Sequence, residues 1–341
     1  MSTRLHNFQT IIAGQGEVAY LTSAWKHFVG EEYDHARFVK AHVDFVNQWD
    51  WDWVKINPRA TYYAETWGST YDPGNYPGAL PALVEAAIAT PADLIKITAL
   101  KAAQSPILSE EISRARDIKA AFPDRAVLQT VFSPLGVLLF LAGISPFPPD
   151  PRQTPDASLP LADLLGSDPA LTKQALAAIA ETLNDYVREL LAPVEAGGAG
   201  LDGIFYAVLG TPSRGFIPRD QFDELSAPYD QTVLEAARGA AVVFHTCSAD
   251  SHPDWFSDWP ISALQWDQAL PGNPEISQDL GVVPVGGPEA RLFGEGEDLT
   301  VLTTQLARTL QQRAGKPFLL APSCSTPVQT SSAALDLLRK A

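Results

Sequence analysis

Residues 240–248 read A-A-V-V-F-H-T-C-S, and this stretch carries the clearest structural signal in the chain. The run Ala241–Phe244 is short, apolar and partly β-branched, which is typical of a strand buried on both faces of a parallel sheet. His245 and Cys247 follow it directly. Because side chains alternate along an extended chain, these two point to the same side. We therefore expect a buried strand that ends in an imidazole and a thiol.

The second cysteine of the chain, Cys324, closes another buried run, P-F-L-L-A-P-S-C over residues 317–324. Two thiolates and one imidazole are donors that zinc prefers, and a catalytic zinc keeps one position open beyond three protein ligands. We interpret His245, Cys247 and Cys324 as three ligands of one Zn²⁺. The alternative is two structural cysteines and an unrelated histidine, since cysteine is often buried for packing reasons.

Outside this stretch the chain alternates between short apolar runs and helical patterns. The pattern predicts strands at 53–57, 93–98, 126–132, 201–208, 241–245, 263–267, 282–286 and 317–321. Helices are expected at 80–89, 106–121, 169–191, 219–238, 298–313 and 331–340, after a helical extension over about 1–50. Such alternation predicts an α/β fold, a (β/α)8 TIM barrel, as a single domain over 1–341. An open doubly wound sheet is the rival, but no glycine-rich phosphate loop follows the first predicted strand.

Composition and charge narrow the class of partner. The formal charge is −16, which disfavours nucleic acid and anionic membrane surfaces as partners. No apolar run reaches the roughly 18–20 residues that a membrane span requires, and the N-terminus shows no signal-peptide pattern. We expect a cytoplasmic protein whose two cysteines are free thiols or metal ligands.

In a (β/α)8 barrel the chemistry lies at the carboxyl ends of the strands. The catalytic candidates there are Asp267, otherwise a helix cap, and Tyr206, otherwise a barrel-lining residue. The candidates for substrate binding are Arg59, Glu65, Gly286 and Gly287, the glycines being otherwise explained by a tight turn. The proline-rich insert 141–168 is either a lid over this end or a variable surface loop.

At these residues the sequence resembles the uroporphyrinogen decarboxylase superfamily, over roughly residue 20 to the end. The motif H-x-C followed far downstream by C is similar to that of its zinc-dependent methylcobamide:thiol methyltransferases, the coenzyme M type among them. Further similar stretches are W-V-K-I-N-P-R-A-T-Y-Y-A-E-T-W-G (53–68), A-L-Q-W-D (263–267) and V-P-V-G-G-P-E-A-R-L-F-G-E-G (283–296). The resemblance implies a (β/α)8 barrel, zinc on the three ligands, and methyl transfer from a methylated corrinoid to a zinc-activated thiol.

Two departures from the resemblance affect the expected function. The arginine-rich motif R-Q-A-G-R-Y of true uroporphyrinogen decarboxylases is missing, so decarboxylation of an acidic tetrapyrrole is the less favoured alternative. The corrinoid-binding motif D-x-H-x-x-G is also missing, so methylcobamide would arrive on a separate carrier protein, which we expect to dock near the insert 141–168. A third alternative is a non-catalytic barrel that binds zinc or a small-molecule thiol.

Overall fold

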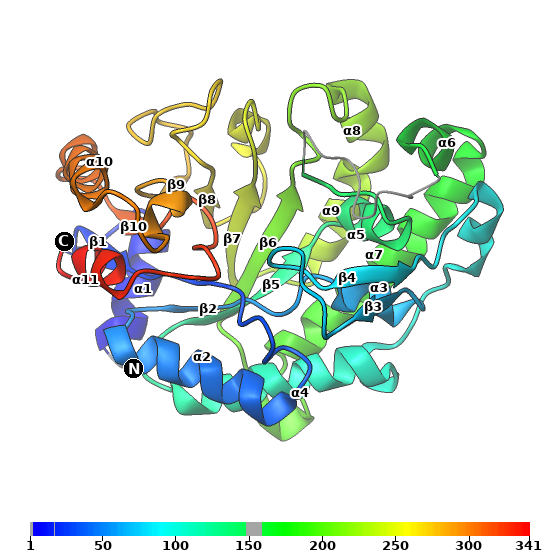
Figure 1. Ribbon diagram of the computed structural model, residues 1–341, viewed down its shortest axis with the longest axis horizontal. Coiled ribbons are helices and arrows are strands. Elements are labelled where there is room, and N and C mark those ends of the chain that lie inside the picture. Colours follow the sequence, from blue (N-terminus) through cyan, green and yellow to red (C-terminus); the bar gives the residue numbers. More distant parts are fainter. Residues whose placement is uncertain (1–2, 17, 148–158) are drawn as a thin grey trace.

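The computed structural model describes residues 3–16, 18–147 and 159–341, and it forms a (β/α)8 barrel of the predicted class (Figure 1). Eight parallel strands are hydrogen-bonded in the order β1-β10-β9-β8-β7-β6-β5-β2. The strands are β1 (Tyr20–Thr22), β2 (Val54–Ile56), β5 (Val127–Phe132), β6 (Gly203–Leu209), β7 (Ala241–Thr246), β8 (Ala263–Gln265), β9 (Val283–Gly286) and β10 (Phe318–Leu320).

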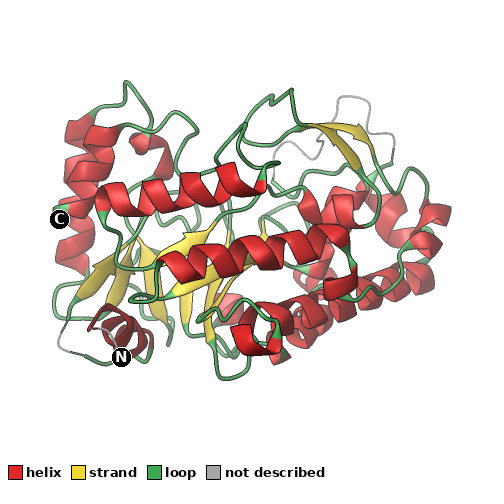
Figure 2. Ribbon diagram, turned by 90° about the horizontal axis from the view of Figure 1, so that it is seen from below, coloured by secondary structure: helices red, strands yellow, loops and turns green. Residues whose placement is uncertain are grey.

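Helices surround the curled sheet (Figure 2). They are α1 (Thr3–Ile12), α2 (His35–Trp49), α3 (Tyr62–Thr66), α4 (Pro106–Ala121), α5 (Pro134–Leu141), α6 (Leu161–Gly166), α7 (Pro169–Leu191), α8 (Arg219–Leu225), α9 (Ala227–Glu235), α10 (Leu299–Gln312) and α11 (Ser332–Arg339). The predicted bounds of α4 and α7 are confirmed to the residue. Both begin with a proline behind a capping side chain, Ser105 or Asp168, which accepts a hydrogen bond from the first turn.

The barrel closes between its first two strands. The Asp52 backbone N–H donates to the Thr22 carbonyl at 3.0 Å, and the Ser23 hydroxyl donates to the Trp53 carbonyl at 2.8 Å. At the amino-terminal end of the barrel, Phe8 and Ile11 of α1 join a core cluster that also contains Trp53. Apolar side chains therefore pack at that end, and in barrels of this class the reaction site lies at the carboxyl ends of the strands.

Three sequence-based expectations are wrong. Residues 93–98 do not form a strand, because Pro91 and the Thr90–Asp93 capping box start a 3₁₀-helix over Pro91–Lys96. Residues 80–89 contain β4 (Ala82–Glu85), which pairs antiparallel with β3 (Thr70–Asp72), instead of a helix. The expected helical extension over 1–50 is limited to α1. Strand β1 pairs with β10 and is part of the barrel, as is helix α2.

The missed strand β1 and the wrongly predicted strand at 93–98 offset each other in the strand count. His245 therefore still lies on the fifth barrel strand, and Cys324 still follows the eighth. Of the insert 141–168, residues 148–158 lie outside the described part of the structure, and the prediction of a lid or loop there stays a prediction. In the described ranges, no helix is both long and apolar enough to cross a membrane.

Candidate metal centre

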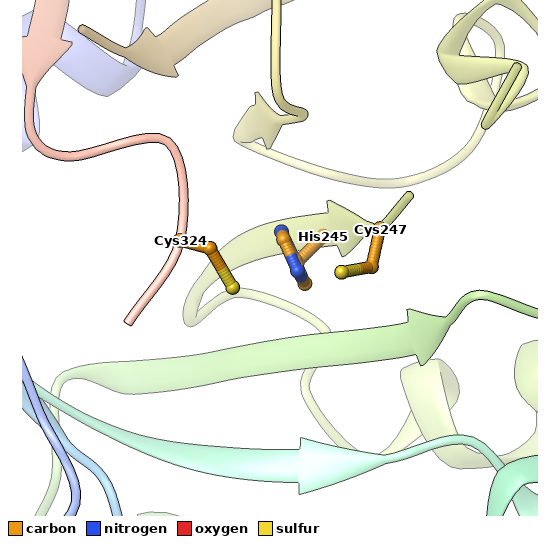
Figure 3. Close-up of side chains that lie close together, drawn as sticks. All are labelled: His245, Cys247 and Cys324. Atoms are coloured by element: carbon orange, nitrogen blue, oxygen red, sulfur yellow. The ribbon is translucent and has the colours of Figure 1, made fainter. Parts of the chain in front are cut away.

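The three predicted ligands lie together at the carboxyl end of the barrel. One ring nitrogen of His245 and the Sγ atoms of Cys247 and Cys324 are all within 4.8 Å of one another. Figure 3 shows the His245 ring between the two cysteines, with both sulfur atoms turned toward it. His245 and Cys247 share one side of the chain at the end of β7, as the alternation predicts.

Backbone contacts fix the position of Cys247. Its N–H donates to the Leu209 carbonyl at 2.9 Å, and its carbonyl accepts a hydrogen bond from the Ser213 hydroxyl at 2.9 Å. The pairing of β6 with β7 slips by one residue between Ala207 and Leu209, so that β6 bulges there. Bulges of this kind often re-aim side chains next to a site, and this one supplies the carbonyl that holds the cysteine.

Cys324 is held by its neighbour Ser323. The Ser323 hydroxyl donates to Oδ2 of Asp267 at 2.6 Å and accepts from the Ala290 N–H at 3.0 Å, while its own N–H donates to the Pro288 carbonyl. These contacts tie the loop after β10 to the loops after β8 and β9. Asp267, a catalytic candidate, thus lies beside the predicted metal ligands, where it contacts the loop that carries Cys324. Burial raises the pKa of the Asp267 carboxyl.

The donor set fits a zinc ion. Tetrahedral zinc with bonds of 2.0–2.3 Å separates its donor atoms by roughly 3.5–4 Å, a small contraction from the arrangement seen here. His245 is buried, and its Nδ1 has no hydrogen-bond partner in the described part of the chain. A buried ring nitrogen without a partner lowers the stability of the folded state. Coordination of a metal ion by Nδ1 would remove this cost.

The hydrogen bond between the two cysteines shifts their pKa values in opposite directions. Hydrogen bonds from Cys247 and from His245 lower the pKa of Cys324 well below its usual range. The same hydrogen bond, with burial, raises the pKa of Cys247. The pair therefore favours one thiolate, on Cys324, beside one thiol. Binding a divalent cation would bring the second thiol to the thiolate form.

The candidate metal centre opens into a cavity of about 400 Å³, here named the metal-site cavity. Its wall is mainly apolar and aromatic, with Trp25, Tyr63, Phe132 and Phe205 among the lining residues. His245 and Cys324 line it, as do the polar side chains of His27, Lys55, Asn57, Thr130 and Gln265. A concave apolar site with a few convergent polar groups is the usual form of a small-molecule site.

Lys55, on β2, is the most unusual of these polar residues. It is 5 % exposed, and its Nζ donates to Oδ1 of Asn57 at 2.6 Å. The ammonium lies over the rings of Trp25 (5.0 Å) and Phe205 (4.4 Å). Burial lowers the pKa of Lys55 to about 7, against an opposing attraction from Cys324. The Asn57 Nδ2 is buried and has no partner among the described residues. The Lys55 ammonium and the Asn57 side-chain amide are therefore two donor groups in the wall of the cavity.

Arg59 and Glu65 lie elsewhere than expected. Neither lines the metal-site cavity. The Arg59 guanidinium is buried and pairs with Glu65 at 3.1 Å and with Glu111 at 3.1 Å. Its charge is already matched by two carboxylates of the chain, and Lys55 is the one lysine or arginine among the described residues that line the cavity.

Tyr206 was expected at the mouth of the barrel, but the alternation of side chains along β6 places it elsewhere. Phe205 and Ala207 line the cavity, so Tyr206 faces the opposite side, toward the helices. It is fully buried there and donates to Asp230 of α9 at 2.5 Å. Burial raises the pKa of Asp230 to about 7. Tyr206 therefore contacts a carboxyl group of α9 and does not line the metal-site cavity.

Gly286 and Gly287 do not line the metal-site cavity either. A Cβ on Gly287 would lie 2.4 Å from the Ala321 carbonyl oxygen, and one on Gly286 would lie 2.7 Å from the Gln268 side chain. Glycine is needed at position 287 because the backbone of the loop after β10 occupies the space of a side chain, whereas at position 286 the Gln268 side chain would have to move.

Sequence reasoning missed Lys55, Asn57 and His27. The sequence did contain an indication for Lys55. A lysine in the middle of the buried run W-V-K-I-N raises the free energy of the folded state unless its charge is compensated, so such a residue is often functional. His27 gave no such signal, since its cavity position depends on strand β1, which the sequence did not predict.

Comparison with known proteins places the chain among relatives of this architecture. It matches the uroporphyrinogen decarboxylase (URO-D) family over residues 26–341. A methyltransferase from Methanosarcina mazei is similar in structure, with a TM-score of 0.75 and 14 % identity over 100 % of this chain and 99 % of that one. A B12-independent methionine synthase from Shewanella sp., solved with selenomethionine, has a TM-score of 0.50 and 10 % identity over 90 % and 86 % of the chains. Identities this low show a shared fold. No curated protein matches the chain.

Proposed function

We propose that this chain, which belongs to the uroporphyrinogen decarboxylase family, is a zinc-dependent methyltransferase that moves a methyl group from a methylated corrinoid to a thiol. The observation that carries the proposal is the convergence of His245, Cys247 and Cys324 at the carboxyl end of the barrel, beside an apolar cavity. The methyltransferase from Methanosarcina mazei, which shares the fold, makes the same class of reaction a natural starting point.

The chain's own residues explain how a thiol would be activated. Two thiolates and one neutral imidazole cancel the charge of Zn²⁺ and leave one position for the acceptor sulfur. Bound zinc would keep that sulfur as an electron-rich thiolate at neutral pH, where a free thiol with a pKa of about 8.5 is mostly protonated. Apolar and aromatic side chains make up most of the cavity wall beside this position, and the Asp267–Ser323 contact holds Cys324 in place.

The acceptor carries an acidic group in this proposal. Lys55 and the unpartnered Nδ2 of Asn57 present two donors to the cavity, and a carboxylate or a comparable anion would satisfy both. An anion there would also stabilise the charged form of Lys55, which burial disfavours.

The methyl donor would be a corrinoid on a separate protein, since the chain has no D-x-H-x-x-G motif. The alternative function, decarboxylation of a tetrapyrrole, is supported by the name of the family, uroporphyrinogen decarboxylase. An acidic tetrapyrrole needs several cations, yet Lys55 is the one lysine or arginine among the described residues that line the cavity. A barrel that binds zinc without catalysis is the remaining alternative.

Zinc content and turnover test the proposal. Purified protein should hold about one zinc per chain, and the Cys324→Ser variant should lose it, while the neighbouring Ser325→Ala variant should keep it. Zinc-loaded protein should then methylate 3-mercaptopropionate with methylcobalamin as donor. Zinc binding without turnover, also with other small thiols, would favour the non-catalytic barrel. Failure to bind zinc under reducing conditions would refute the methyltransferase.

The acidic group of the acceptor has its own test. The Lys55→Met variant keeps a long apolar side chain in the aromatic cage and removes the charge. We expect it to weaken binding of 3-mercaptopropionate about 10- to 100-fold, as for loss of a hydrogen bond to a charged group. Binding of 2-mercaptoethanol, which has no anionic group besides its sulfur, should change little. Equal losses for the two thiols would contradict the assignment of Lys55.

A further inference from the structure

A buried amide group in the wall of the metal-site cavity has an acceptor oxygen that the described chain leaves unpaired. Gln265, the last residue of β8, is fully buried and lines the cavity. Its Nε2 donates to the Pro322 carbonyl at 3.0 Å, and this bond fixes the orientation of the amide. The other amide atom, Oε1, is buried and has no hydrogen-bond partner among the described residues. An unpaired buried acceptor in a cavity wall points to a partner from outside the chain.

Gln265 lies between the two segments that carry the predicted metal ligands. In the pairing of β7 with β8 it is the partner of His245. Neighbouring strands lie about 4.8 Å apart, and paired residues place their side chains on the same side of the sheet. Pro322, which accepts the bond from Nε2, precedes Cys324 by two residues. The Gln265 side chain therefore lies beside the candidate metal centre.

The donors of the cavity wall are on other strands and do not pair with Gln265. The Lys55 ammonium donates to Asn57, and the Thr130 hydroxyl donates to the Ile56 carbonyl at 2.7 Å. Lys55 lies on β2, which stands opposite β8 in the barrel, with β5, β6 and β7 between them on one side and β1, β10 and β9 on the other. A ligand in the cavity thus meets donor groups on one wall and an acceptor on the opposite wall.

We propose that Gln265 is a specificity-determining residue that accepts a hydrogen bond from a hydroxyl or amino group of the acceptor thiol. This inference rests on the proposed function and adds to it the class of thiol. The sulfur lies at the metal centre, the acidic group lies toward Lys55, and the donor lies close to the sulfur, where Gln265 is. The acceptor is then a small acidic thiol with an O–H or N–H group, and an acidic thiol with an otherwise apolar chain is disfavoured.

The selectivity arises from the free energy of leaving Oε1 unpaired. A ligand without a donor displaces water from the cavity and gives the Gln265 oxygen no partner, which weakens binding. A ligand with a hydroxyl or amino group pairs this oxygen. Sites that hydrogen-bond a polar group of the substrate therefore reject analogues that lack the group more strongly than an apolar wall would.

Three thiols that differ in one group test the assignment. 3-Mercaptopropionate has no donor besides its sulfur, whereas its 2-hydroxy derivative and its 2-amino derivative, cysteine, each add one at the same carbon. Affinities for zinc-loaded protein are measured by calorimetry. The wild type should bind at least one of the two derivatives about 5- to 10-fold more tightly than 3-mercaptopropionate, as for one added hydrogen bond. The derivative that binds more tightly distinguishes a hydroxyl from an amine.

Two matched variants separate this hydrogen bond from direct coordination of the metal by the added group. Gln265→Met has a similar size without a carbonyl oxygen, and it should bind the three thiols with equal affinity. The control is Gln129→Met on β5. Gln129 is also fully buried with an unpaired Oε1, but its Nε2 donates to the Tyr186 hydroxyl at 3.3 Å and it does not line the cavity. The control should keep the preference of the wild type.

The outcomes distinguish this inference from the function on which it rests. Equal affinities of the wild type for the three thiols, or a preference that persists in Gln265→Met of confirmed zinc content, would overturn the role of Gln265 and leave the proposed function standing. If Gln265→Met does not fold or does not hold zinc, Gln265→Asn takes its place. It keeps the amide but withdraws the carbonyl by one carbon, so it should also lose the preference. Failure of all three thiols to bind wild-type protein of confirmed zinc content would refute the thiol acceptor itself, and the role of Gln265 with it.

Discussion

Replacing Lys55 with methionine should change how the stability of the metal-free protein depends on pH. Burial lowers the pKa of Lys55 from 10.5 to about 7, while the unfolded chain keeps the ordinary value. Between these two values the unfolded state binds more protons, so raising the pH favours the folded state. Below about pH 7 both states carry the charge, and the folded state bears the full cost of burying it.

The size of the effect follows from the shift. At about 1.4 kcal/mol per pKa unit, a shift of this size costs on the order of 5 kcal/mol at low pH. The free energy of unfolding of the wild type, relative to Lys55→Met, should rise by roughly 2–3 kcal/mol from pH 7.5 to 9.5. Methionine fills the cage of Trp25 and Phe205 without a charge, so the variant should also be the more stable protein at pH 7.5.

The assay is urea unfolding of both proteins at several pH values, under reducing conditions with a chelator present. Taking the difference between the two proteins cancels, to first order, the titration of groups that do not interact with Lys55. The control is Lys40→Met, which removes an exposed lysine that pairs with Asp44 on α2. Its difference from the wild type should stay flat. A flat difference for Lys55→Met as well would refute the reasoning, because Lys55 would then titrate as an ordinary lysine.

Three further substitutions separate orientation, packing and charge. Ser323→Ala removes the contact to Asp267 and should lower zinc affinity about 10- to 100-fold in a chelator competition, with the fold intact by circular dichroism. Arg59→Met removes the guanidinium partner of Glu65 and one of the two partners of Glu111, which keeps Arg114 at 2.6 Å, and should cost roughly 1–3 kcal/mol in urea unfolding. A loss of thiol binding at unchanged stability would instead restore Arg59 as a substrate residue. Tyr206→Phe removes the hydrogen bond to Asp230 and should cost about 1–3 kcal/mol of stability, while kcat of the folded enzyme stays the same.

Local chemistry explains which parts of the fold could be predicted. The helices α4 and α7 were predicted to the residue because a capping side chain and a proline mark their starts. The strands β5, β6 and β7 were recognisable because each is mostly apolar, although Gln129 and Thr130 interrupt the apolar run in β5. The strand β1, Tyr20–Thr22, is three residues long and could not be recognised, since what makes it a strand is its pairing with β10.

The sequence by itself determined the zinc ligands as candidates. His245 and Cys247 follow a buried strand with the spacing that places two side chains on one side, and this property needs no other part of the chain. The alternation of strands and helices likewise determined the barrel, and the barrel placed the chemistry at one end.

Only the tertiary structure decided which other groups meet the ligands. The positions of Cys324, Lys55 and His27 around one cavity depend on the curvature and order of the sheet, which bring together segments far apart in the chain (Figure 1). The same packing turned Tyr206 away from the cavity and paired Arg59 with carboxylates. A sequence shows which residue could carry a charge or donate a proton, but whether a partner neutralises that charge depends on contacts that form only when the chain folds.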